Sequence, residues 1–192
     1  KSSDYIAGVW EASNYRTERQ VFHVNGREVH NLAVQLTGKG RADQILLIGA
    51  HYDSVRGCPG ANDNGTGVAA MLEMARLLAG IRLHCSVRFV AFVNEEPPFF
   101  QTRQMGSWVY ASRCRLRREH IIGMISLETI GYYSDMPGSQ HYPIPLALLY
   151  PDTANFIGIV GNLDSKNLVN RVTETFRRHS DFPSESLSAP GW

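Results

Sequence analysis

Apolar and polar residues alternate along two short stretches near the beginning of this 192-residue chain. Residues 19–24 (RQVFHV) and 30–37 (HNLAVQLT) both show the period of two that is typical of a half-buried strand. The dipeptide Asn25-Gly26 lies between them and favours the tight turn of a hairpin. The pattern therefore predicts an antiparallel β-hairpin at this point of the fold.

Further along the chain, nearly continuous apolar runs alternate with stretches of helical spacing. The runs, which predict buried strands, are 44–50 (QILLIGA), 86–93 (SVRFVAFV), 121–127 (IIGMISL) and 154–160 (ANFIGIV). Helices are predicted at 67–78, with Gly80 as the stop, at 108–116, and from a cap at Asp164 or Ser165 through Arg177. This alternation predicts an α/β fold with a largely parallel sheet and the hairpin at one side.

The length fits a single domain, residues 1–192, and 43% hydrophobic residues are enough for a core. The net charge of +1 argues against a nucleic-acid partner, and the arginines from Arg113 to Arg118 are typical of a solvated helix end. Neither an apolar run of membrane-spanning length nor a signal-peptide pattern is present, so no membrane association is expected.

The cysteine pattern places weak limits on the compartment. Cys58, Cys85 and Cys114 are odd in number and lack the C-x-x-C spacing of a zinc site. We therefore expect no disulfide framework, although a single pair stays open.

Side chains that can bind metal follow three of the predicted buried strands and one adjoining loop. They are His51, Asp53, Asp63, Glu95, Glu96 and Glu128. Because the carboxyl ends of parallel strands meet at one edge of a sheet, we expect these groups to converge. Several carboxylates in one cleft repel each other unless cations neutralise them. Mixed histidine and carboxylate ligands suit zinc, and two ions that share one carboxylate would balance most of this charge.

Each candidate also has an ordinary structural explanation. Asp63 lies in an ANDNG stretch and could be only a turn or helix-cap residue. A lone histidine such as His51 is more often structural than a ligand, and Glu128 could simply be a charged residue at a strand end. Three strand ends that all present ligand types are much less expected by chance, which favours a metal site.

Three stretches carry a family resemblance: GAHYDSVRGCPGANDNGTGVAAMLEMAR, FVNEEPPFFQTRQMGS and ISLETIGYYSD. They resemble the co-catalytic zinc aminopeptidases, the metallopeptidase family twenty-eight that includes bacterial leucyl aminopeptidase and aminopeptidase Y. Glutaminyl cyclase and plasma glutamate carboxypeptidase belong to the same family. The resemblance extends from about Ile6 onward. It implies a three-layer α/β/α zinc-exopeptidase fold around a mixed, mostly parallel sheet, and a peptide or amino-acyl substrate. It favours a secreted or periplasmic location and leaves a cytoplasmic one open.

The resemblance implies a role for each candidate residue. His51 and Glu128 bind one zinc ion, and Asp53 orients the histidine. Glu96 binds a second zinc ion, and Asp63 bridges the two ions.

The same resemblance implies peptide hydrolysis with Glu95 as the general base. Glu95 takes a proton from a water that bridges the metal ions, and the resulting hydroxide attacks the scissile carbonyl. One ion polarises that carbonyl, and the other anchors the free α-amino group, which gives exopeptidase selection.

Two departures from the family pattern change the expected activity. Members often carry aspartate where this chain has Glu128, and the family's fifth ligand, a histidine in an S-D-H stretch, has no counterpart here. His141 and His179 do not match that position. We therefore expect a chain that lacks the C-terminal part of the domain, is weakly active or inactive, and binds fewer than two zinc ions tightly. The missing part would add sheet strands, so an oligomer contact at the incomplete sheet edge is also expected.

Two other functions stay open. One is glutaminyl cyclase-like acyl transfer with one zinc ion, against which the presence of His51 argues. The other is a non-catalytic, degenerate binding domain of the same fold, which the intact set of candidates disfavours. Substrate preference cannot be read from these residues.

Overall fold

The structure is a computed structural model that describes residues 1–144 and 146–190. The chain divides into two compact units, Lys1–Gly131 and Tyr132–Trp192. The first unit contains all six candidate site residues.

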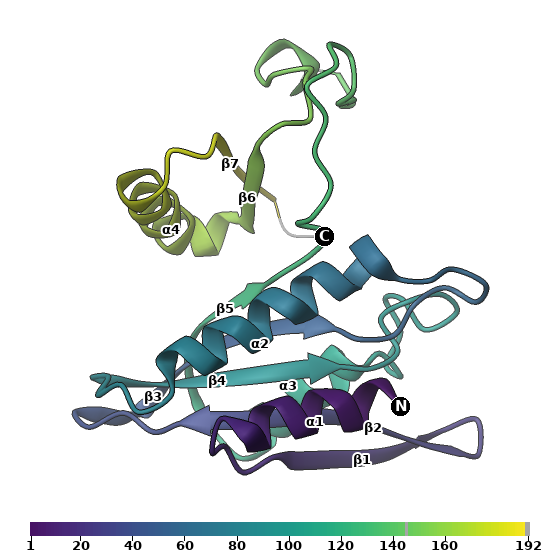
Figure 1. The fold of residues 1–192 in the computed structure, drawn as a ribbon, viewed down its shortest axis with the longest axis vertical. Helices are drawn as coiled ribbons and strands as arrows, with labels where there is room; N and C mark the ends of the chain where they lie inside the picture. The colour runs from purple at the N-terminus through teal and green to yellow at the C-terminus, as the bar shows by residue number, and fades with distance from the viewer. Residues whose placement is uncertain (145, 191–192) are drawn as a thin grey trace. The chain divides into compact units, whose positions relative to one another are not determined.

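A five-stranded mixed sheet in the order β1-β2-β4-β3-β5 forms the centre of the first unit (Figure 1). Its strands are β1 (Glu18–Val24), β2 (Arg27–Leu36), β3 (Arg41–His51), β4 (Cys85–Phe92) and β5 (His120–Ser126). β1 with β2 and β2 with β4 are antiparallel, whereas β3 is parallel to both β4 and β5. The predicted α/β class and mixed sheet are confirmed.

The predicted hairpin is present, with Val24 paired to Arg27 across the turn. Asn25 and Gly26 have φ values of 51° and 76°, respectively. A two-residue turn with both φ values positive matches the twist of the flanking strands, and asparagine followed by glycine accepts this conformation most readily.

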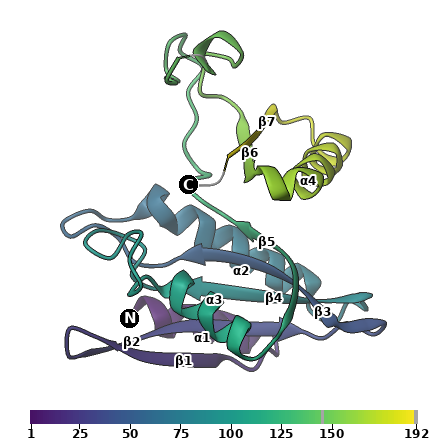
Figure 2. The same ribbon diagram turned by 180° about the vertical axis from the view of Figure 1, so that it is seen from behind.

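Three helices cover the two faces of the sheet: α1 (Ser2–Ala12), α2 (Gly67–Leu78) and α3 (Gly106–Leu116). α1 and α2 lie on one face, and α3 lies on the other, as the two opposite views show (Figures 1 and 2). The helix pair packs through Trp10 and Met71, whereas α3 packs through Tyr110 and Cys114 in a separate cluster. The three-layer arrangement is therefore confirmed.

The central strands bury side chains on both faces, which explains their continuous apolar runs. Ile48 and Phe89 belong to the cluster beneath α1 and α2, whereas Leu47 and Val90 belong to the cluster beneath α3. Successive residues of a strand point to opposite faces, so one run of apolar residues supplies both cores.

Helix α1 was not predicted, although its apolar residues have helical spacing. Ile6, Ala7 and Trp10 are buried, and Trp10 has no exposed surface. Residues i, i+1 and i+4 share one face of a helix, so this short stripe docks α1 on the sheet.

The second unit contains a single β-α-β element. β6 (Ile157–Asn162) and β7 (Ser184–Ala189) pair in parallel, and α4 (Lys166–His179) connects them. β7 was not predicted. Ser165, one of the two predicted caps, is the N-cap residue of α4, but its side chain makes no capping hydrogen bond. The side chain of Asn162 accepts a hydrogen bond from Ser165 N at 2.8 Å and so caps the short 3-10 turn Leu163–Ser165 that precedes α4.

Within the described ranges, none of the helices combines the length and the apolar character needed to cross a membrane. Cys58, Cys85 and Cys114 are all free thiols.

Candidate metal centre

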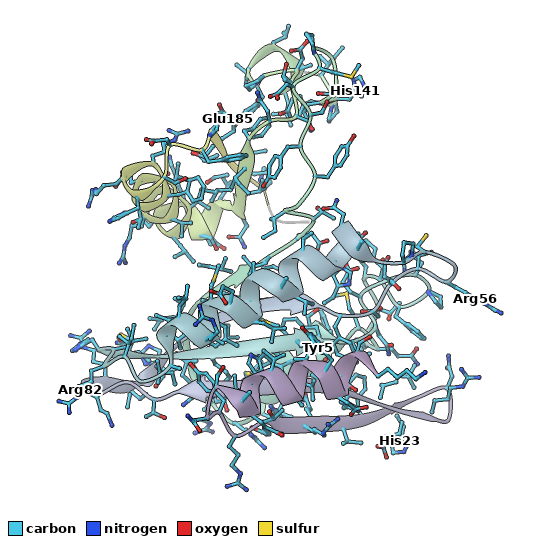
Figure 3. The ribbon with its side chains drawn as sticks, in the orientation of Figure 1. Tyr5, His23, Arg56, Arg82, His141 and Glu185 are labelled. Carbon is cyan, nitrogen blue, oxygen red and sulfur yellow. The ribbon has the colours of Figure 1, made fainter. Side chains whose placement is uncertain are left out.

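The candidate side chains come from the carboxyl ends of the three parallel strands. His51 is the last residue of β3, Glu95 lies just after β4, and Glu128 lies just after β5. Asp63 lies in the kinked segment Ala61–Thr66, immediately before α2, and its own φ of −104° and ψ of 97° are not helical. The loop between β3 and this segment carries Arg56 at its outer end (Figure 3).

His51 lies at the centre of the cluster and is 3% exposed. Its Nε2 atom lies 3.0 Å from Asp63 Oδ1, 3.4 Å from Glu128 Oε1 and 3.8 Å from Glu95 Oε2. One donor atom each from His51, Asp63 and Glu128 lies within 4.8 Å of the other two. The structure therefore brings together three potential ligands and one further carboxylate.

The opposite side of the imidazole faces Asp53. His51 Nδ1 lies 3.2 Å from the Asp53 carbonyl oxygen and 3.6 Å from Asp53 Oδ1. With Nδ1–H donating to Asp53, the Nε2 lone pair points at the carboxylates, which is the tautomer that a metal ligand needs. The Asp53 carboxylate also accepts hydrogen bonds from the backbone N–H groups of Glu95 and Glu96, at 3.1 and 3.2 Å. Asp53 thus ties the exit of β3 to the exit of β4.

The charges of the cluster favour a cation. Burial alone lowers the pKa of His51, but hydrogen bonds to Asp53 and Glu128 and the nearby carboxylates raise it to about 10. Burial raises the pKa of Glu95 against the opposing charge of His51, and the neighbouring carboxylates add to the rise. Burial also acts to raise the pKa of Asp53, but its hydrogen bonds from His51 and from backbone N–H groups hold that pKa below its usual range. A positive charge at His51 Nε2 therefore stabilises this arrangement.

Asn64 holds the cluster together, and the sequence alone did not single it out. This side chain is 1% exposed. Its Nδ2 donates to Leu127 O at 2.8 Å and to Glu128 Oε2 at 3.1 Å. Its Oδ1 accepts from Gly67 N at 3.1 Å and from Thr129 N at 3.3 Å. Asn64 therefore joins the start of α2 to the exit of β5 and leaves the other Glu128 oxygen facing His51.

Two neighbours of Asn64 repeat this connection further along the same loop. Asn62 Oδ1 accepts from Gly131 N at 3.1 Å, and Thr66 Oγ1 accepts from Ile130 N at 3.1 Å. The signal that could have found these residues is their position beside Asp63 in a loop rich in asparagine and threonine, side chains that commonly bind backbone groups.

Comparison with known proteins identifies the family. A profile of Peptidase family M28 matches residues 31–182. The chain belongs to peptidase family M28. YfbL from Escherichia coli, an uncharacterized protein, is 39% identical over 202 residues, which cover 100% of this chain and 61% of YfbL. The M28 chain thus spans about three fifths of this relative.

Solved structures share the fold of this M28 chain. BSAP, a zinc aminopeptidase from Bacillus subtilis, has a TM-score of 0.61 and 24% identity, over 87% of this chain and 36% of that one. The glutaminyl cyclase of Macrostomum lignano has a TM-score of 0.69 and 17% identity, over 100% and 64%, respectively. Because proteins with different chemistry share this architecture, the fold alone does not decide the reaction.

The donor set of the M28 chain fits zinc. One imidazole nitrogen and carboxylate oxygens converge, the histidine is oriented from behind by Asp53, and Glu128 is held by Asn64. Zinc accepts nitrogen and oxygen donors, and a site with three protein ligands leaves a position for water or substrate. His51, Asp63 and Glu128 would hold such an ion.

The second predicted ion has fewer described donors. Glu96 enters the network through its backbone N–H and is not in the three-donor group found among the described residues. His141 and His179 both belong to the second unit, where His141 lies in the segment before β6 (Figure 3). The role of Glu96 as a ligand stays a prediction.

Proposed function

We propose that this protein is a zinc-dependent aminopeptidase that removes N-terminal residues from peptides. The observation that carries the proposal is the position of Glu95, whose Oε2 lies 3.8 Å from His51 Nε2 beside the donors of Asp63 and Glu128. A carboxylate next to a zinc site is placed to move protons during hydrolysis. Membership of peptidase family M28 and the likeness to a zinc aminopeptidase support this reading.

Zinc held by His51, Asp63 and Glu128 would supply a Lewis acid for the scissile carbonyl and would make water more acidic. Glu95, at 30% exposure, can reach both solvent and the metal site. From this position Glu95 takes a proton from the attacking water at Oε2. Glu95 then returns the proton to the leaving amine.

The other residues act by positioning. Asp53 accepts from His51 Nδ1–H and so keeps the tautomer with a free Nε2 lone pair. Its carboxylate also accepts a hydrogen bond from the backbone N–H of Glu95 and so fixes the position of that backbone. In this proposal, Glu96 would hold a second ion together with Asp63, and that ion would supply a binding partner for the free α-amino group of the peptide. The half-exposed side chain of Asp63, 52% accessible, leaves room for both roles.

Glutaminyl cyclisation is the second candidate, because the Macrostomum lignano enzyme shares the fold with a TM-score of 0.69. Both reactions need a metal and a carboxylate acid–base group, but the cyclase forms a ring from an N-terminal glutaminyl residue and needs no attacking water. Substrates therefore separate the two.

The test uses the purified chain with added zinc or cobalt. Release of p-nitroaniline from leucine- and arginine-p-nitroanilide is compared with cyclisation of a glutaminyl peptide. Glu95→Gln should lower hydrolysis by about 100-fold or more, since general-base catalysis is worth about 10²–10⁴. Glu11→Gln, an exposed residue of α1 outside the metal site, is the matched control. Undiminished hydrolysis by the Glu95 variant would remove Glu95 as the base.

Two other outcomes reject the aminopeptidase proposal. Cyclisation without hydrolysis supports the second candidate. A metal-loaded chain that neither hydrolyses nor cyclises these substrates supports a non-catalytic role for the fold.

A further inference from the structure

Asn31 is a buried polar residue that none of the metal chemistry explains. It lies in β2 and has no exposed surface. Its Oδ1 accepts a hydrogen bond from Val93 N at 3.0 Å, and its Nδ2 donates to Gly106 O and to Gln20 Oε1, both at 2.8 Å. A buried amide stabilises the fold when its hydrogen bonds are made and destabilises the fold when they are lost. The native positions of Val93, Gly106 and Gln20 are therefore favoured by their hydrogen bonds to Asn31.

The partners of Asn31 form the base of one loop. Val93 directly follows β4, and Gly106 is the first residue of α3, so these two residues enclose the segment 94–105 (Figure 2). They are also joined directly, because Gly106 N donates to Val93 O at 2.8 Å. Asn31 thus adds two hydrogen bonds to the one that already closes the loop.

This closure requires a glycine at its second end. A Cβ atom on Gly106 would collide with the Val93 carbonyl oxygen and with Asn31 Oδ1. The close approach of α3 to the end of β4 is therefore possible with glycine, which has no side chain.

The loop that is closed in this way carries Glu95. Asn94, at 7% exposure and φ of 59°, turns the chain directly after Val93, and Glu95 follows. On its far side the Glu95 N–H is held by Asp53. The backbone of Glu95 is therefore fixed from two directions, by Asp53 at the metal site and by Asn31 within the core beneath α3.

We propose that Asn31 is a positioning residue for Glu95: it clamps the base of the loop 94–105 and so sets the place of the general base relative to the metal donors. This inference rests on the proposed function, since it assigns Asn31 a part in the same reaction. The Asn31 side chain acts through its hydrogen bonds to Val93 and Gly106.

The geometry selects the variant for the test. Asn31→Asp has nearly the same shape and as a carboxylate can still accept from Val93 N, but it can donate neither to the Gly106 carbonyl at the loop nor to Gln20 Oε1. Ser86→Ala is the matched control. Ser86 is also fully buried, donates to Ala42 O at 2.7 Å and accepts from Gly38 N at 3.1 Å, at the opposite end of β4.

The first measurement is hydrogen exchange of residues 94–105 in the zinc-free chain. Asn31→Asp should speed exchange of this segment by about tenfold, the factor that corresponds to one buried hydrogen bond, whereas Ser86→Ala should leave it unchanged. Equal exchange in this segment for the two variants overturns the proposal. If the aspartate variant does not fold, Asn31→Ser, which keeps a hydroxyl at the site, takes its place.

The second measurement is kinetic. Asn31→Asp should lower kcat by about 10- to 100-fold, the range expected from displacing a catalytic group, with KM and zinc affinity within about twofold. In the Glu95→Gln background the same change should cause no further loss. An additional loss in that background, or an equal fall in zinc affinity, shows general damage and overturns the proposal. If the unaltered zinc-loaded chain shows no hydrolysis, the proposed function fails, while the exchange measurement still decides whether Asn31 clamps the loop.

Discussion

Replacement of Asn64 by alanine tests whether this asparagine holds the metal centre together. Asn64→Ala removes hydrogen bonds to Leu127 O, Glu128 Oε2, Gly67 N and Thr129 N. Thr129 is exposed and Glu128 is 47% accessible, so water can replace the bonds to these two residues. Gly67 is buried and Leu127 is partly buried, so the Gly67 N–H and the Leu127 carbonyl are less accessible to water when they lose the Asn64 side chain.

The expected loss of stability follows from those two groups. An unsatisfied buried donor or acceptor costs about 1–3 kcal/mol, so two of them give a loss of about 3 kcal/mol in the free energy of unfolding. Asn62→Ala is the matched control, because Asn62 Oδ1 accepts one exposed hydrogen bond from Gly131 N. Its loss should be about 0.5 kcal/mol. Without its bond to Nδ2, Glu128 is also free to rotate, and zinc affinity should fall about tenfold.

The assay is urea unfolding followed by tryptophan fluorescence at pH 7. Trp10 lies in the core beneath α1 and α2 with no exposed surface, so it reports on the first unit. Trp108 and Trp192 are replaced by phenylalanine in every variant, which leaves Trp10 as the fluorophore, since the chain has three tryptophans. A competing chelating dye measures zinc affinity.

The reasoning is refuted if the two asparagine variants lose the same stability within about 0.5 kcal/mol, which is the scale of a neutral surface substitution. A zinc affinity that is unchanged in Asn64→Ala would separately show that Glu128 needs no support from Asn64.

Three further predictions concern the metal donors, a partly buried ion pair and the loop closure. Zinc at about 100 times its Kd should raise the free energy of unfolding by about 2.7 kcal/mol. His51→Ala should abolish zinc binding in a calorimetric titration and with it this stabilisation; stabilisation by zinc that persists in the variant would reject this donor set. Burial acts to raise the pKa of Glu119, but the hydrogen bonds from Arg88 and Cys114 and the charges of Arg88 and Arg113 together lower it. The stability of the Arg88–Glu119 pair is therefore complete above the unfolded pKa of about 4.3 and is lost as the pH falls through the lower folded pKa. Glu119→Gln should therefore lose about 2 kcal/mol at pH 7 and lose less at pH 3, and an equal loss at both pH values in urea unfolding would contradict this. Gly106→Ala should destabilise by about 2 kcal/mol, whereas Gly8→Ala, where α1 has open space, should be neutral or stabilising; equal urea midpoints would deny the close approach at Gly106.

The order of hydrophobic and polar residues determined most of the sheet. The strand β4, for example, is one apolar run because its two faces enter two cores, and a pattern of this kind needs no knowledge of the partners. The same local logic predicted the Asn25-Gly26 hairpin and α2. The pattern did not predict α1, because its buried residues Ile6, Ala7 and Trp10 span less than two helical turns. Their burial depends on packing against a sheet whose strands come later in the sequence.

The candidate site divides in the same way. His51, Glu95 and Glu128 could be proposed from the sequence because each follows an apolar run, and the ends of parallel strands must meet. Their distances, the tautomer of His51 and the direction of the pKa shifts of His51 and Glu95 required the tertiary structure, since each depends on groups from another strand.

What the sequence by itself determined is the chemical type of the site and the elements that carry it: strand ends with histidine and carboxylates in a family of metallopeptidases. What only the tertiary structure decided is how those ends are held. Asn64 reaches Glu128 across 64 positions, and Asn31 reaches Val93 across 62. An asparagine in a sequence shows no sign of such partners, because its hydrogen bonds become specific only when folding removes water and leaves one set of groups within reach.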